Sequence, residues 1–163
     1  MAEEKVKLNY PLLGNYIHRF FGVELNGITW QLLATENRSK EDTFKMIAAA
    51  QASLYHWLET DSQPINAQRG HWLVSHIYSH LLLPEGALLH ANRCWEITDE
   101  NQFKDFDLAF AYEAMARAYG ILGNEDEFKK YLELAQKAGE KIENEDDRKV
   151  FDSTLETCKL IKQ

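Results

Sequence analysis

The chain has 163 residues, a length that suits one domain with its own apolar core. Its net charge of −8 argues against duplex DNA, RNA or an anionic membrane as the main partner, because those ligands bind basic faces. Cys94 and Cys158 have no metal-type spacing and form no evident disulfide framework, which favours reduced thiols. The first residues lack the pattern of a signal peptide, and no segment approaches the length of a membrane span, so we expect a cytoplasmic protein.

The first predicted helix runs from about residue 12 to 34 and has two apolar faces. One stripe at helical spacing consists of Ile17, Phe21, Leu25, Ile28 and Leu32. A second set lies off that stripe and consists of Tyr16, Phe20, Val23 and Trp30. We expect Gly22 or Gly27 to bend or interrupt this helix.

Three further helices are predicted before residue 99. Ser39 can cap a helix that continues to about residue 60. Pro64 and the polar residues before it favour a turn, so the next helix is expected from about 66 to 82. Pro84 can open a fourth helix that ends near Thr98.

The last part of the chain predicts three more helices. The fifth covers about 107–122, after which Gly123 suits a helix end and Asn124 can cap the sixth. The seventh is expected over about 144–162, with one apolar stripe and one charged face, a pattern typical of a helix that ends a stack. Strand signals are almost absent. The sequence therefore predicts an all-α protein of seven helices in antiparallel pairs.

An internal repeat links the third and fourth helices to the fifth and sixth. At one constant offset the repeat pairs Ser75 with Ala116, Tyr78 with Tyr119, Ala87 with Phe128 and Cys94 with Ala135. Small residues let helices approach closely, and one helical hairpin cannot bury both of its faces. We therefore predict stacked hairpins in which Tyr78, Ala87, Cys94, Ala116, Tyr119 and Ala135 are packing residues.

Residues 112–138 resemble the tetratricopeptide repeat family. The matching positions are Tyr112, Met115, Ala116, Tyr119, Gly123, Leu132 and Ala135. Phe128 replaces a small alanine of the family pattern and Glu140 replaces its usual proline. A weaker unit at 71–99 has His71 at the family's tryptophan position and Ala91 at an aromatic one. The stretches 54–73 and 106–120 are also similar to small uncharacterised bacterial helical-repeat proteins, a likeness that implies no activity.

The resemblance implies one domain over 1–163, folded as a right-handed α-α superhelix of helical hairpins. Its clearest units span about 66–99 and 107–141, and the helix at about 144–162 caps the last pair. In this family the first helix of each pair lines a concave groove that binds a peptide or a partner protein. The corresponding groove residues here are Arg69, Trp72, His76, Ser79, Phe110, Glu113 and Arg117.

These groove residues have functional and structural interpretations. Trp72 and Phe110 are large apolar groups that can anchor a ligand, and Arg69 and Arg117 offer forked donors for a carboxylate. Alternatively, Trp72 packs against the preceding helix, for example on Trp57. Glu113 and Arg117, four residues apart, then form a surface ion pair.

Motifs for metal binding or catalysis are incomplete. His76 and His80 share a helix face, but the glutamate of H-E-x-x-H is missing and no third ligand is evident. His90 and Cys94 lie one turn apart, although Cys94 occupies a packing position of the repeat. A thiolate pair of Cys94 with His56 or His90 is conceivable, yet the chain has no nucleophile elbow, P-loop or dinucleotide-binding fingerprint. We predict no metal and no cofactor.

The function predicted from the sequence is a non-enzymatic module that binds a protein or peptide in the groove of the helices at 66–82 and 107–122. The alternative is an enzyme or small-molecule binder with a closed polar pocket. That pocket would consist of His56, Arg69, His76, His90 and Glu113. A third possibility is a homo-oligomer that associates through the same groove.

Overall fold

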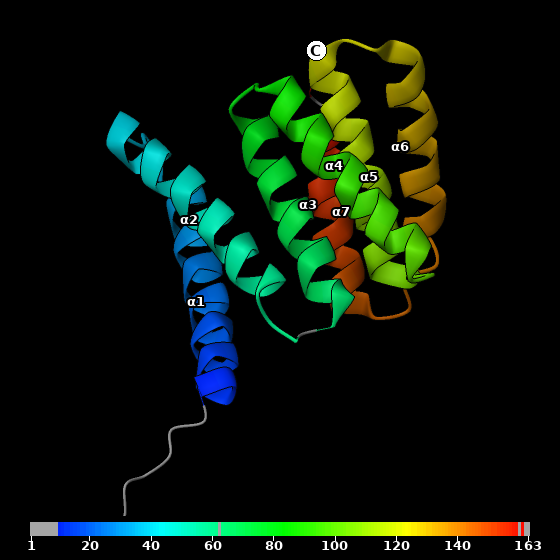
Figure 1. The fold of residues 1–163 in the computed structure, drawn as a ribbon. Coiled ribbons are helices and arrows are strands. Elements are labelled where there is room, and N and C mark those ends of the chain that lie inside the picture. The colour runs from blue at the N-terminus through cyan, green and yellow to red at the C-terminus, as the bar shows by residue number, and fades with distance from the viewer. Residues whose placement is uncertain (1–9, 62, 160, 162–163) are drawn as a thin grey trace, which may run out of the picture. The chain divides into compact units, whose positions relative to one another are not determined.

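A computed structural model describes residues 10–61, 63–159 and 161 of the chain. These residues form seven α-helices and no strand, which confirms the predicted all-α class (Figure 1). The helices are α1 (Tyr10–Leu33), α2 (Lys40–Leu58), α3 (Pro64–His80), α4 (Pro84–Glu100), α5 (Asp105–Leu122), α6 (Glu125–Gly139) and α7 (Glu145–Lys159). Within the described part of the chain, none of these helices is long and apolar enough to cross a membrane.

The helix boundaries follow local signals in the sequence. Ser39 caps α2 by accepting a hydrogen bond from the backbone N–H of Asp42 at 3.0 Å, and Asn124 caps α6 by accepting one from Glu127 at 3.3 Å. Both α3 and α4 begin with a proline, where the missing N–H costs nothing. Gly123 ends α5 with φ of +80°, a conformation that favours glycine.

The structure contradicts an interruption of the first helix at a glycine, one of the two predicted alternatives. α1 continues through both Gly22 and Gly27. Gly22 has a packing role instead, because a Cβ at this position would lie 2.8 Å from Cε2 of Trp57 on α2. Ser53 adds a hydrogen bond by donating to the Gly22 carbonyl at 2.7 Å. The absent side chain thus lets the two helices approach closely.

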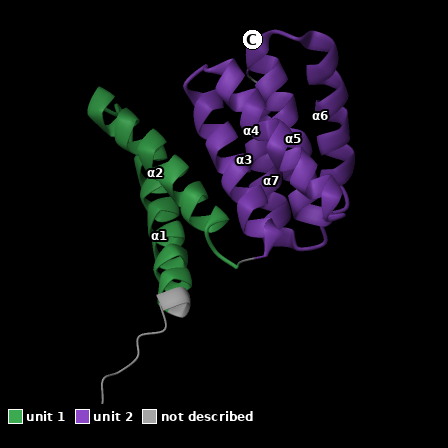
Figure 2. Ribbon diagram, viewed as in Figure 1, with its two compact units in different colours: residues 1–62 green, residues 63–163 purple. Residues whose placement is uncertain are grey.

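The chain divides into two compact units, residues 1–62 and 63–163 (Figure 2). In unit 1, α1 packs against α2 as a hairpin. Its buried apolar residues lie mainly on one face of α2: Met46, Ala49, Ala50 and Leu54. In unit 2, α5 packs against α3, α4, α6 and α7 and is therefore its central helix. The single domain expected over 1–163 stays a prediction.

Equivalent positions of the predicted repeat make equivalent contacts in unit 2. The Ser75 hydroxyl donates to the Ala87 carbonyl at 2.9 Å, and Ala116 shares a buried cluster with Phe128. The predicted small packing residues Ala87, Cys94, Ala116 and Ala135 are fully buried. The tyrosines Tyr78 and Tyr119 are half-buried against the same clusters. The packing role predicted for these six residues is confirmed.

Candidate functional site

The residues predicted to line the groove lie on α3 and α5 of unit 2. α5 packs against α3 on one side and α7 on another, so side chains at the predicted groove positions meet a neighbouring helix. Phe110 is 5% exposed, and its ring meets the rings of Trp72 on α3 and Phe151 on α7 edge to face. The centroid distances are 5.0 Å and 5.2 Å. Phe110 is therefore a core residue here, and α7 covers it.

α7 contributes an apolar stripe to this contact. Phe151, Leu155 and Cys158 follow one another at helical spacing and are buried. The outward residues of α7 are mostly charged, and several form exposed ion pairs such as Arg148 with Asp152. α7 thus packs on α5 and α6 as an amphipathic helix, as the sequence predicts for the helix at 144–162.

Glu113 and Arg117 form a buried ion pair rather than a surface pair. Arg117 Nε donates to Glu113 Oε1 at 2.6 Å, and the two side chains are 4% and 0% exposed. Trp72 Nε1 donates to the second carboxylate oxygen of Glu113 at 3.0 Å. The carboxylate is therefore paired at both oxygens, as a buried charge requires.

Arg117 also joins α5 to α7. Its Nη2 donates to the Thr154 carbonyl at 2.9 Å and to the Thr157 hydroxyl at 2.8 Å. Both acceptors lie in the C-terminal half of α7, where the helix dipole favours a cation. Because the guanidinium carries several donors in a fixed plane, it bonds Glu113 through Nε and α7 through Nη2.

Arg69 is the one predicted groove cation that is half exposed, and its donors face Asp107 of α5. Nε and Nη2 bond the two carboxylate oxygens of Asp107 at 2.7 Å and 3.1 Å. This bidentate hydrogen bond raises the pKa of Arg69 above its usual value. In this structure the guanidinium of Arg69 binds Asp107, and not a ligand carboxylate, and so holds α3 to α5.

His76 lies inside the unit and stacks on Trp72. The two rings have centroids 4.9 Å apart and an interplanar angle of 24°. Burial, followed by the charge of Arg117 and then His80, lowers the pKa of His76 well below its usual value. His76 is therefore neutral near pH 7. Ser79, the last groove position on α3, is also buried.

The six histidines of the chain form three close pairs. The nitrogen–nitrogen distances are 3.1 Å for His18 with His56, 3.0 Å for His71 with His90 and 3.1 Å for His76 with His80. Each pair requires at least one neutral ring, because two imidazolium ions have only donors. The first two pairs join residues 38 and 19 positions apart, so no local spacing in the sequence could have revealed them.

The residues of the alternative polar pocket have close contacts of their own. His56 pairs with His18 in unit 1. Within unit 2, Arg69 bonds Asp107, Glu113 bonds Arg117 and His90 faces His71. Among the described residues no group of three or more His, Cys, Asp or Glu side chains is placed to hold a metal ion. Burial raises the pKa of the Cys94 thiol far above its usual value, so this thiol is a poor nucleophile.

Comparisons with protein-family models, with curated proteins and with solved structures found no match to this chain. The candidate site has the charged donor Arg117 buried under the amphipathic helix α7, and aromatic contacts of Phe110 with Trp72 on α3 and Phe151 on α7.

Proposed function

We propose that this protein is a non-enzymatic cytoplasmic interaction module that binds a helical segment of a partner protein. In this proposal unit 2 is a right-handed stack of the tetratricopeptide kind. The partner helix takes the place at the end of the stack where α7 packs on α5 and α6. This differs from an open groove on α3 and α5, because the side chains of that groove contact neighbouring helices.

The observation that carries the proposal is the hydrogen bonding of Arg117 to α7. The buried guanidinium donates to the main-chain carbonyl of Thr154 and to the hydroxyl of Thr157, so it would recognise a helix through one carbonyl and one hydroxyl side chain. Phe110 adds an apolar contact for an anchor residue such as Phe151. Residues 151, 155 and 158 follow the i, i+4, i+7 pattern with which amphipathic helices bind to apolar surfaces.

α7 then acts as an internal occupant that competes with the partner. Its outer face is mostly polar, and three side chains of its inner face are buried: Phe151, Leu155 and Cys158. A partner helix with the same anchor spacing would meet Phe110, Arg117 and the C-terminal part of α6. The apparent affinity for the partner would be the intrinsic affinity multiplied by the fraction of time that α7 leaves the site open.

The test uses a labelled peptide of residues 144–163 and the full-length chain with Phe151→Ala and Leu155→Ala, which weaken α7. Fluorescence anisotropy should show that this variant binds the peptide and that the wild-type chain binds it much more weakly. A peptide carrying Phe151→Ala is the matched control and should bind the variant at least about tenfold more weakly. A variant that keeps its helical circular dichroism yet fails to bind the wild-type peptide would refute the helix-binding site.

A further inference from the structure

α1 carries a seam of residues spaced like the a and d positions of a coiled coil. The intervals alternate between three and four, and the seam consists of Leu13, Tyr16, Phe20, Val23, Gly27 and Trp30. Such spacing keeps one side of a helix against a second helix. α2 does not take this place, because α1 packs on α2 through Gly22, which lies off the seam.

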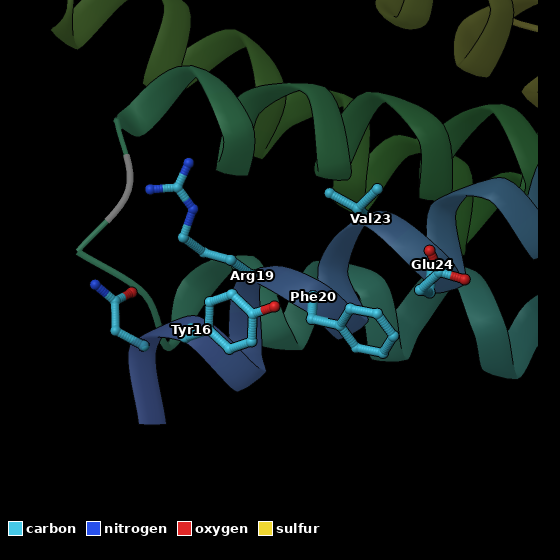
Figure 3. A pocket seen from close by; sticks show the side chains of 6 residues that line it. Tyr16, Arg19, Phe20, Val23 and Glu24 are labelled. Atoms are coloured by element: carbon cyan, nitrogen blue, oxygen red, sulfur yellow. The ribbon is translucent and has the colours of Figure 1, made fainter. Parts of the chain in front are cut away.

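The seam is exposed in the chain. Tyr16 is 69% exposed, Phe20 50% and Val23 57%. Figure 3 shows these three side chains following one another along α1, where they line a hollow with Asn15, Arg19 and Glu24. An apolar stripe of this length on a water-facing helix marks an interaction surface.

We infer that this seam pairs with the same seam of a second copy of the chain, with the two α1 helices antiparallel. In one register the pairing is complementary in size. Phe20 then faces Val23 of the second copy, Tyr16 faces Gly27 and Leu13 faces Trp30, so each layer combines a larger with a smaller side chain. Within the chain, a Cβ added at Gly27 meets no atom within 4 Å, which leaves room for the tyrosine ring of the second copy.

A parallel pairing fits less well. It would place Gly27 against Gly27 and Trp30 against Trp30, leaving one layer empty and another overfilled. The charges favour it slightly, because Arg19 and Glu24 then occupy the flanking positions that form ion pairs in parallel coiled coils. Exposed ion pairs contribute little compared with the burial of aromatic side chains, so packing decides for the antiparallel orientation.

A second copy is the occupant that the surface chemistry favours. α1 carries Arg19 and Glu24 as its charged residues, one of each sign, so two copies of it do not repel one another despite the net charge of −8. In the described part of unit 2 the exposed large apolar residues are scattered. They are Leu82, Leu83, Leu89, Leu122 and Val150, and no helix carries a stripe of them. The seam of one copy is therefore complementary to the seam of a second copy. Its residues belong to α1, whereas α7 packs on α5 and α6.

The first test measures the mass of the full-length protein by sedimentation equilibrium over a range of concentrations. The wild type should reach twice the 18.9 kDa chain mass, and Gly27→Leu should raise the dimer dissociation constant at least about tenfold by filling the space of Tyr16. Gly14→Leu is the matched control, because Gly14 is in α1, has free space around its Cβ and lies off the seam. Adding Tyr16→Ala to Gly27→Leu should restore association. A wild type that stays at 18.9 kDa up to about 100 μM, or equal effects of the two glycine variants, would overturn the inference.

The second test fixes the orientation by oxidative cross-linking. The double variant Tyr16→Cys/Gly27→Cys should form a covalent dimer, because these positions face each other in the antiparallel register. Tyr16→Cys alone should not, since the two copies of position 16 are then 11 residues apart along the seam, about 16 Å. A covalent dimer from the single variant would show a parallel pair and contradict the antiparallel register.

Discussion

The ring of Phe110 on α5 meets the ring of Phe151 on α7 edge to face, with centroids 5.2 Å apart and planes at 82°. This contact places α7 over the side of α5 from which Arg117 also projects. Aromatic pairs in this geometry stabilise beyond the burial of their area, by about 0.5–1.5 kcal/mol. Phe110 therefore contacts α7 as well as Trp72 of α3 in the folded chain.

Arg117→Ala should destabilise the protein strongly. It leaves the Glu113 carboxylate buried without its cation and removes two hydrogen bonds to α7, so the free energy of unfolding should fall by about 3–5 kcal/mol. Urea denaturation measures this change. Lys129→Ala is the control, because Lys129 and Glu125 have the same i,i+4 spacing on an exposed face. A loss no larger for Arg117 than for Lys129 would mean that the buried pair has little effect.

Ala116→Leu should overpack the contact between α5 and α6. Ala116 is fully buried beside Phe128 and Cys158, so three further carbon atoms have no space there. We expect a loss of about 1–3 kcal/mol in the free energy of unfolding. Thermal unfolding followed by circular dichroism measures this loss. The control is Ala48→Leu at an exposed position of α2, which should melt close to the wild type. Equal melting of both variants would refute a tight contact at Ala116.

Gly139→Ala should disturb the packing of α7 on α6. A Cβ at this position would overlap Cε1 of Phe151, so either the ring or α7 has to shift. The expected cost is about 1–3 kcal/mol by chemical denaturation. Gly14→Ala should instead stabilise the chain by about 0.5–1 kcal/mol, because its Cβ meets open space and alanine favours a helix. A neutral or stabilising Gly139→Ala would place Phe151 elsewhere.

Acidification should weaken the folded state through His71, which pairs with His90. Burial, with smaller contributions from the charges of His90 and Arg93, lowers the pKa of His71 to about 4 from its ordinary 6.5. Between those two pH values the unfolded chain binds more protons than the folded one, so stability is full above pH 6.5 and falls towards pH 4. Allowing for partial exposure, His71 should contribute a loss of about 1–2 kcal/mol over this range.

Urea midpoints between pH 7 and pH 4 measure this loss. His71→Gln removes the titrating group, so its stability should fall less between pH 7 and pH 4 than that of the wild type. The control is Glu140→Gln at an exposed position of unit 2, whose stability should fall as much as that of the wild type. Identical pH profiles for His71→Gln and the wild type would show that the His71–His90 pair does not couple folding to protonation.

Local signals in the sequence were enough to predict the seven helices. Ser39, Asn124 and two prolines determine where helices begin, and the offset between Ser75 and Ala116 predicts which small residues pack. These features depend on a few neighbouring residues or on one helical hairpin. The sequence therefore carries them in its spacing, without any knowledge of how distant helices meet.

The contacts of the candidate site needed the structure. Glu113 and Arg117 have the spacing of a surface pair, and nothing nearby in the sequence shows that α7 covers them. One signal was present: α5 carries apolar residues around most of its circumference, as a central helix requires, and α7 has an apolar stripe that needs a partner surface. The histidine pairs depend on tertiary packing between residues far apart in the chain.

The displaceability of α7 is measured most directly by native-state hydrogen exchange of the full-length chain, read by mass spectrometry of its peptides. If α7 is an internal occupant of a helix-binding site, its amides should exchange through a local opening of lower free energy than that of α5. The Phe151→Ala/Leu155→Ala variant should speed exchange in α7 far more than in α3 and α4. Equal protection of α7 and α5, with both exchanging only on global unfolding, would contradict a displaceable helix and the binding site beneath it.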